Sequence, residues 1–378
     1  MNRAIESLFQ AGPPDAAQVD RFIADNDFPL VEQGHVTFVY RGAADEVVLR
    51  RWISGLSTAQ SLEPLEGSDL WALTMELPDG SRFEYKYEVV RQGVRQLVVD
   101  ELNGVLAHDP FGANSVCQGY GYRRPAWSLE DPEASRGSLE SMAIASAALG
   151  QRREVQVYLP ARFRRSRTYP LLIVHDGKDF LRYADLRTVL DNLIHRLEIP
   201  GMIVALTQSP DRLAEYTGDP RHARFIGDEL LPALTAKFPL FDDRAQRGLM
   251  GASLGAVAAL HTASVYPECF GQLLLQSGSF AFSDLGHHKK GPVFDPVVTF
   301  INRYRAHPQA LAEKIYMSCG IYESLIYENR SLLPLLQAQG MQVNYEEVRD
   351  AHNWENWRDR LRQGLTWLFP GPLWMVYE

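Results

Sequence analysis

One short segment of the chain, GLMGASLGAV, holds a serine that could act as a nucleophile. Ser253 stands between Gly251 and Gly255, after an apolar run and before an alanine-rich one. Serine and glycine weaken helices and strands alike, so the segment is predicted to be a sharp junction between a strand and a helix. In such a junction the serine hydroxyl projects at the edge of a sheet, where only small neighbours fit beside it. These residues predict attack of the Ser253 hydroxyl on an acyl group.

A serine hydroxyl needs a general base, and the base needs a group that orients it. His352 follows the strand-like run QVNYEEV and precedes an amphipathic segment, which is the loop position expected for the base. His175 is the rival, but it precedes the serine in the chain and is better suited to shaping the oxyanion side. For the acid we expect Glu323, after the run KIYMSCG, with Glu328 as the alternative. Asp350 lies too close along the chain to orient His352 easily.

Two backbone N–H groups must stabilise the oxyanion that forms at the carbonyl oxygen of the acyl group. One should come from Leu254, directly after the nucleophile. The other should come from the loop HDGKDF, in which Gly177 permits a tight turn and Lys178 N–H is the candidate donor.

Two different patterns of apolar residues along the chain predict the elements that position these residues. From about residue 28 to 125 the runs are short and rich in valine, phenylalanine and tyrosine, which is typical of an antiparallel sandwich. After residue 152, apolar runs alternate with helical spacing, which predicts a mostly parallel sheet covered on both faces. We therefore expect a helical extension at 1–27, a β-sandwich at 28–127, a linker at 128–150 and an α/β domain at 151–378.

The composition narrows the classes of function. The chain has 378 residues and a formal net charge of −9, which argues against a nucleic-acid binder because phosphates need a basic face. No run approaches 18 apolar residues and no leader is recognisable, so we expect a cytoplasmic protein without a membrane contact. The three cysteines are scattered, so neither a disulfide framework nor a metal site is predicted, and no cofactor is expected.

Four segments together resemble the esterase D and enterochelin esterase group of α/β-hydrolases, over nearly all of residues 152–370. These segments are LLIVHDGKDF, the stretch from DNLIHRLEIPGMIV to DELLPAL, RGLMGASLGAVAALHTASVYPECFGQLLLQSGSF and AHNWENWRDRL. The resemblance implies an α/β-hydrolase fold with a mostly parallel sheet, Ser253 as nucleophile, His352 as base and an acid near Glu323. It implies catalysis through an acyl-enzyme.

The chain departs from this family at two places. Ala256 stands where many members have a second glycine, and Asp350-Ala351 replaces a glycine pair that is common before the histidine.

Several residues of the matching segments are candidates for the substrate pocket. Arg212, Glu215 and Tyr216, in DRLAEY, match a family stretch near the pocket, and they either contact substrate or form an ion pair and a packed ring. Trp354, two residues after the base, is a further substrate-binding candidate.

The amino-terminal half resembles the early-set, glycogen-binding-like sandwiches of the immunoglobulin-like class that precede some of these esterases. Trp52 and Trp71 are candidates for a sugar platform, with sandwich-core packing as the alternative. In enterochelin esterases a comparable domain lies beside the active site and helps enclose the siderophore.

The leading hypothesis is a cytoplasmic serine esterase that opens the ester bonds of a siderophore of the enterobactin type. The alternative is a carbohydrate esterase that removes feruloyl or acetyl groups, with the sandwich as a glycan-binding module. A third hypothesis is an inert binding protein on a hydrolase fold. The expected partner is a small-molecule ester, which is a ferric siderophore in the leading hypothesis, and the oligomeric state stays open.

Overall fold

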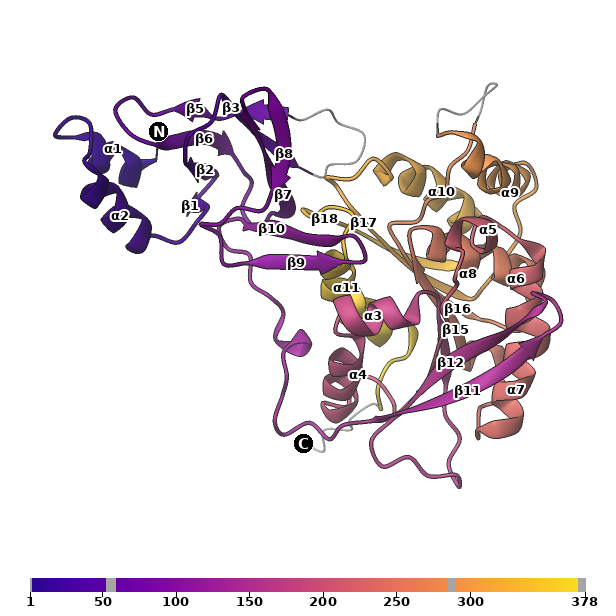
Figure 1. Ribbon diagram of the computed structural model, residues 1–378. Coiled ribbons are helices and arrows are strands. Elements are labelled where there is room, and N and C mark those ends of the chain that lie inside the picture. The colour runs from indigo at the N-terminus through magenta and orange to yellow at the C-terminus, as the bar shows by residue number, and fades with distance from the viewer. Residues whose placement is uncertain (1, 52–58, 284–289, 373–378) are drawn as a thin grey trace. The chain divides into compact units, whose positions relative to one another are not determined.

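The computed structural model describes residues 2–51, 59–283 and 290–372 (Figure 1). Contacts along the chain divide it into two compact units, each built from separate segments. The sandwich unit comprises Met1–Arg124, Gly320–Ser324 and Arg349–Asn353. The α/β unit comprises Pro125–Cys319, Leu325–Val348 and Trp354–Glu378. Two short loops late in the chain therefore group with the sandwich unit, although the sequence predicted that they belong to the α/β domain.

The sandwich unit begins with two helices, which strands follow. In the described residues its elements are α1 (Arg3–Phe9), α2 (Ala16–Ala24), β1 (Leu30–Glu32), β2 (His35–Arg41), β3 (Glu46–Arg51), β4 (Ala59–Ser61), β5 (Glu63–Pro64), β6 (Leu70–Glu76), β7 (Arg82–Arg91), β8 (Val94–Val98), β9 (Leu106–Asp109) and β10 (Gly112–Gln118). Helix α2 starts at a capping box, in which Asp15 and Gln18 each accept a backbone hydrogen bond from the other. Its apolar residues Val19 and Phe22 pack in a cluster with Val39 of β2.

Two antiparallel sheets enclose the core of this unit. One sheet has the order β1-β2-β6-β5, and the other has the order β4-β3-β7-β10-β9, with β8 paired to β7. Alternate residues of a strand point to the same face, and accordingly Phe38 of β2 meets Phe83 and Tyr85 of β7 in the shared core.

The α/β unit is organised around one sheet of eight strands in the described residues. Its strands are β11 (Ser138–Ser146), β12 (Gln151–Leu159), β13 (Leu171–Val174), β14 (Ile203–Leu206), β15 (Arg247–Ala252), β16 (Gln272–Gln276), β17 (Lys314–Gly320) and β18 (Gln342–Val348). They lie in the order β11-β12-β14-β13-β15-β16-β17-β18. The first two pairings are antiparallel, and the strands from β14 to β17 are parallel.

Helices cover both faces of this sheet, as Figure 1 shows. The helical elements are η1 (Ala126–Ser128), α3 (Gly177–Tyr183), α4 (Leu186–His195), α5 (Arg212–Glu215), α6 (Pro220–Arg224), η2 (Phe225–Leu230), α7 (Leu231–Lys237), η3 (Arg244–Gln246), α8 (Leu254–Val265), η4 (Pro292–Phe294), α9 (Asp295–Ala306), α10 (Ile326–Ala338) and α11 (Trp354–Leu368). Leu171 and Ile173 of β13 lie on the face of the sheet that α7 to α10 cover. Leu172 and Val174 lie on the opposite face, which α3, α4 and α11 cover. Because both faces are covered, the strands read as continuous apolar runs.

This arrangement, a mostly parallel sheet with helices on both faces preceded by an all-β sandwich, confirms the predicted α/β-hydrolase fold class. One boundary differs from the expectation. Strand β11 lies inside residues 128–150, which we expected to be a linker. It is the edge strand of the sheet and most of its side chains are exposed, so it lacks the apolar alternation by which a strand is recognised in a sequence.

Candidate active site

Ser253 occupies the turn between β15 and α8, and its backbone is left-handed. Its φ is 57° and its ψ is −120°, a conformation that residues with a side chain rarely adopt. A Cβ atom on Gly251 would lie 2.3 Å from the carbonyl carbon of Gly255, which explains why residue 251 is glycine. The turn between β15 and α8 is therefore tightly closed around the serine.

The surroundings of Ser253 supply a hydroxyl and a helix terminus. Ser253 N–H donates to Gln276 O at 2.9 Å, and Ser253 Oγ lies 3.2 Å from Ser279 Oγ. Sequence reasoning missed Ser279, because only the fold brings it next to Ser253. Leu254 N–H is the first of α8, where the opening N–H groups have no partner inside the helix and favour negative charge.

Glu323 and His352 form a direct pair. Glu323 Oε2 and His352 Nδ1 lie 2.6 Å apart, and Glu323 Oε1 accepts a hydrogen bond from Gly320 N–H at 2.6 Å. The carboxylate side chain is fully buried, whereas 28% of the imidazole side chain is exposed. A carboxylate at Nδ1 holds the proton on that nitrogen and leaves Nε2 as the proton acceptor.

Glu323 and His352 lie in loops that follow two strands of the same sheet. Glu323 follows β17 and His352 follows β18, the neighbouring strand of the sheet. Strands β15, β16 and β17 are parallel, so the carboxyl ends of β15 and β17 lie at the same sheet edge. Ser253 and Glu323 follow those two ends.

Glu328, the alternative acid, has a different partner. It lies on α10, where its carboxylate forms an ion pair with Lys290. This pairing favours Glu323 as the acid that orients His352.

His175, the rival base, is fully buried at the end of β13. Its Nδ1 lies 3.0 Å from Met250 O, and its ring contacts the rings of Tyr216 and His222. Burial, together with His222, lowers the pKa of His175 to about 3, so the imidazole is neutral at physiological pH. The position favours a structural role beside the turn at residues 251–255, which we call the elbow, because β13 pairs with β15.

Replacing His175 with asparagine should make the free energy of unfolding less sensitive to pH. The pKa of His175 is lowered from 6.5 to about 3 in the folded chain, so only the unfolded chain binds this proton between those pH values. The stability that depends on the neutral ring is present above about pH 6.5 and is lost on acidification by about 1.4 kcal/mol per pH unit. Urea unfolding of both proteins from pH 4 to 7 measures the difference, and parallel profiles would show that the expectation is wrong.

Asp176, which sequence reasoning also missed, is a buried carboxylate beside the elbow. Burial raises its pKa to about 6, and the guanidinium of Arg212 opposes that shift. Arg212 Nε donates to both carboxylate oxygens at 2.9 and 3.0 Å, and 39% of the arginine side chain stays exposed. Tyr216 is fully buried, and its hydroxyl accepts a hydrogen bond from Asp176 N–H at 3.3 Å. Of the two alternatives for this stretch, the structure contains ion pairs and a packed ring, but Arg212 pairs with Asp176 and Glu215 pairs with Arg153.

The second predicted oxyanion donor lies in the first turn of α3. A Cβ atom on Gly177 would lie 2.5 Å from the Leu206 backbone, so this turn requires glycine. Lys178 N–H points to Gln208 Oε1 at 3.3 Å, a long hydrogen bond, and the lysine side chain is exposed.

The predicted substrate tryptophans are packed against other side chains. Trp354 is 9% exposed and meets Phe180 and Trp357 edge to face. Trp71 donates from Nε1 to Gly42 O at 3.1 Å and packs against the sandwich core. These contacts favour structural roles, and Trp52 lies outside the described residues.

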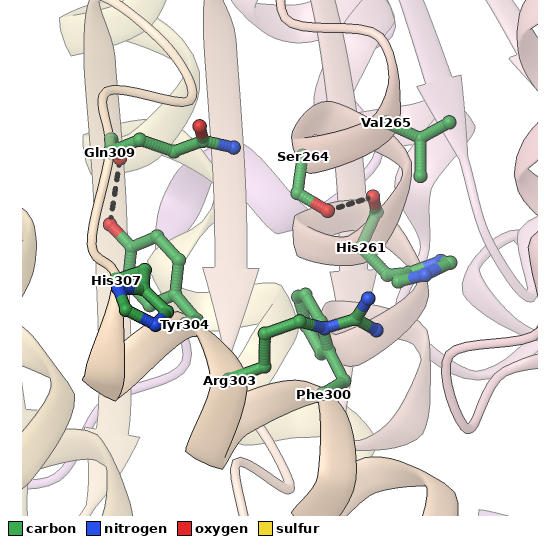
Figure 2. Close-up of a pocket in the computed structure, with 8 residues that line it drawn as sticks. All are labelled: His261, Ser264, Val265, Phe300, Arg303, Tyr304, His307 and Gln309. Atoms are coloured by element: carbon green, nitrogen blue, oxygen red, sulfur yellow. Dashed lines mark hydrogen bonds between the residues drawn. The ribbon is translucent and has the colours of Figure 1, made fainter.

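A separate cavity of about 330 Å³ opens between α8 and α9 (Figure 2). Figure 2 shows its lining residues, which are His261, Ser264, Val265, Phe300, Arg303, Tyr304, His307 and Gln309. His261 lies eight residues after Ser253, or roughly 12 Å along the helix axis. The cavity therefore does not belong to the elbow.

The described residues also bear on the membrane-spanning and metal-binding classes of protein. Residues 2–51, 59–283 and 290–372 contain no helix that is long and apolar enough to cross a membrane. Within the same ranges, no group of three or more His, Cys, Asp or Glu side chains is placed to hold a metal ion.

Comparisons with known proteins agree with this geometry. The family model Esterase, described as "Putative esterase", matches residues 146–368. The iron(III) enterobactin esterase of Escherichia coli O6:H1 is 25% identical to the chain, over 88% of this chain and 91% of that protein. The solved ferric enterobactin esterase of Salmonella typhimurium has a TM-score of 0.74 at 22% identity, covering 88% of this chain and 93% of that one. The enterobactin esterase of Shigella flexneri, solved in the presence of enterobactin, has a TM-score of 0.71 at 23% identity and covers 88% and 92%.

Proposed function

Because the chain belongs to the Esterase family and is a carboxylic ester hydrolase, we propose that it hydrolyses the ester bonds of a siderophore of the enterobactin type. In this proposal Ser253 is the nucleophile, His352 is the general base and Glu323 orients the base. The observation that carries the catalytic assignment is the buried Glu323 carboxylate at 2.6 Å from His352 Nδ1.

The proposed reaction has two halves. Ser253 Oγ attacks the ester carbonyl and gives its proton to His352 Nε2, while the N–H groups of Leu254 and Lys178 donate to the oxyanion. The carbon–oxygen bond to the alcohol then breaks, His352 returns the proton to the leaving oxygen, and an acyl-enzyme remains. Water attacks this ester through the same base and releases the acid and free Ser253.

The choice of substrate rests on the extent of the likeness. The Esterase model spans only residues 146–368, which lie almost entirely in the α/β unit. The relatives named enterobactin esterases match 88% of the chain, so the likeness must extend into the sandwich unit. The chain shares this second unit with the relatives named for enterobactin, which supports a substrate of that type.

We also propose that this activity takes place in the cytoplasm. Cys117 and Cys269 are both free thiols. Free thiols fit a reducing compartment, in which structural disulfides are rare.

A panel of esters tests the proposed substrate. We expect kcat/KM for a cyclic catecholate triester to exceed that for nitrophenyl acetate and for a feruloylated oligosaccharide by about tenfold or more, because contacts to remote parts of a large substrate lower the barrier at the scissile bond. The measurement is the steady-state rate of the purified full chain on each ester.

The other outcomes of this panel are equally informative. A higher kcat/KM on the feruloylated oligosaccharide would favour the carbohydrate esterase hypothesis. No turnover of any ester would favour the inert binding protein.

A further inference from the structure

A buried arginine at the start of β7 contacts the loop that carries His352. The side chain of Arg82 is 2% exposed. Its Nη1 donates to Asn353 Oδ1 at 2.9 Å and to Asp350 Oδ1 at 3.3 Å, and its Nη2 lies 3.7 Å from Glu84 Oε1. Arg82, Asp350 and Asn353 all belong to the sandwich unit.

The two acceptors of Arg82 flank His352 in the chain. Asp350 Oδ1 also accepts from Ala351 N–H at 2.7 Å and from Asn353 Nδ2 at 2.9 Å, which closes the loop around the histidine. Arg82 adds a main-chain bond, since its N–H donates to Arg349 O at 2.8 Å. One strand of the sandwich therefore holds the backbone before His352 at Arg349 O, and the side chains of Asp350 and Asn353 on either side of His352.

The loop that carries Glu323 is held by the residue before Arg82. Ser81 is fully buried, and its Oγ lies 2.6 Å from the hydroxyl of Tyr322. Tyr322 N–H donates to Asp350 O at 3.1 Å, so the two loops are also bonded to each other. A Cβ atom on Gly320 would lie 2.3 Å from Asp350 O, which shows how closely they approach.

Stability alone does not account for a buried guanidinium here. An apolar side chain of similar volume often stabilises a fold as well as a buried ion pair does, because both charges of the pair lose their water. The ion pair fixes the positions of the groups that it contacts, because the guanidinium is rigid and its hydrogen bonds are directional.

We propose that Arg82 is a positioning residue for catalysis, through which the sandwich unit holds His352 at Glu323. The proposal rests on the proposed role of His352 as the base. It predicts that the sandwich unit contributes to kcat on every ester, including small ones, and not only to the binding of large substrates.

The test is Arg82→Met in the full chain, assayed on nitrophenyl acetate. We expect kcat to fall about a hundredfold with KM nearly unchanged, because a displacement of about 1 Å in a catalytic group costs about that much. Arg82→Lys should restore part of kcat, since an ammonium can still donate to one acceptor. Arg50→Met is the matched control, because it removes a two-bond pair with Glu88 in the same sheet without touching the loop, and kcat should not change.

A second variant keeps the proposal testable if Arg82→Met does not fold. Asn353→Ala removes one acceptor of Arg82 without leaving a buried charge unpaired, and it should lower kcat about tenfold at a nearly unchanged thermal midpoint. Wild-type kcat in a folded Asn353→Ala or Arg82→Met chain would overturn the positioning role. So would an equal loss of kcat in Arg50→Met.

His352→Ala separates this proposal from the proposed function. Arg82→Met should cause no further loss in the His352→Ala background, because Arg82 acts through the histidine. A further loss there would overturn the positioning role. Wild-type activity of His352→Ala would instead refute the base assignment on which the proposal rests.

Discussion

Replacing Ser253 with alanine should lower kcat for ester hydrolysis about a millionfold, since loss of a covalent nucleophile typically has an effect of that size. The fold should persist, because the substitution removes one oxygen atom from a half-buried side chain, and that atom lies 3.2 Å from Ser279 Oγ. The measurements are the steady-state rate on nitrophenyl acetate and the thermal midpoint of both proteins.

Ser279→Ala is the matched control for this experiment. It removes the other hydroxyl of the same contact and leaves the nucleophile in place, so kcat should change far less. If Ser253→Ala keeps even a tenth of wild-type turnover, Ser253 is not the nucleophile.

Replacing Glu323 with glutamine should lower kcat by about four orders of magnitude, because an amide cannot hold the proton on His352 Nδ1 as a carboxylate does. His352→Ala should lower kcat further, since it removes the base itself. The measurement is kcat of each variant on the same small ester.

Glu328→Gln is the control here, because Glu328 is paired with Lys290, whereas His352 Nδ1 meets Glu323. It should leave kcat unchanged. An unchanged kcat for Glu323→Gln together with a large loss for Glu328→Gln would move the acid role to Glu328.

The nucleophile elbow could be predicted because its geometry is local. Gly251, Ser253 and Gly255 are close along the chain, and the clash that a Cβ atom on Gly251 would make involves Gly255 itself. The strand before it and the helix after it are strongly apolar, so their type was also clear from the sequence. The roles of these residues in catalysis stay predictions until the variants are measured.

The choice between two acids shows what the sequence alone could not decide. Glu323 and Glu328 are five residues apart, and both follow the run that becomes β17. Only the fold shows that Glu323 turns to His352, whereas Glu328 lies one turn into α10 beside Lys290.

Contacts between distant segments were beyond the reach of sequence patterns. Arg82 and Asp350 are 268 residues apart, and the sequence pattern of neither segment predicts their contact. The same contact explains a departure from the family pattern. Asp350-Ala351 replaces a glycine pair, and here Asp350 is held by Arg82 while Ala351 is buried in the sandwich core.

Candidate substrate contacts were also difficult to judge from residue types. Tyr216 and Trp354 lie in segments that match the family, yet both are buried among other aromatic rings. Large aromatic side chains supply both core packing and ligand contact, so their identity does not distinguish the two roles.

The central claim is that Ser253 is the nucleophile and that the Glu323–His352 pair activates it. The most direct test is to label the full chain with a fluorophosphonate, digest it with trypsin and locate the label by fragment mass spectrometry. Attack by Ser253 Oγ expels fluoride and forms an oxygen–phosphorus bond, so the account predicts one phosphonyl group per chain, on Ser253. Esterase activity should disappear in proportion to labelling, and labelling should be much slower in His352→Ala. Complete inactivation with the label on another residue, or full activity in a chain labelled at Ser253, would contradict the account.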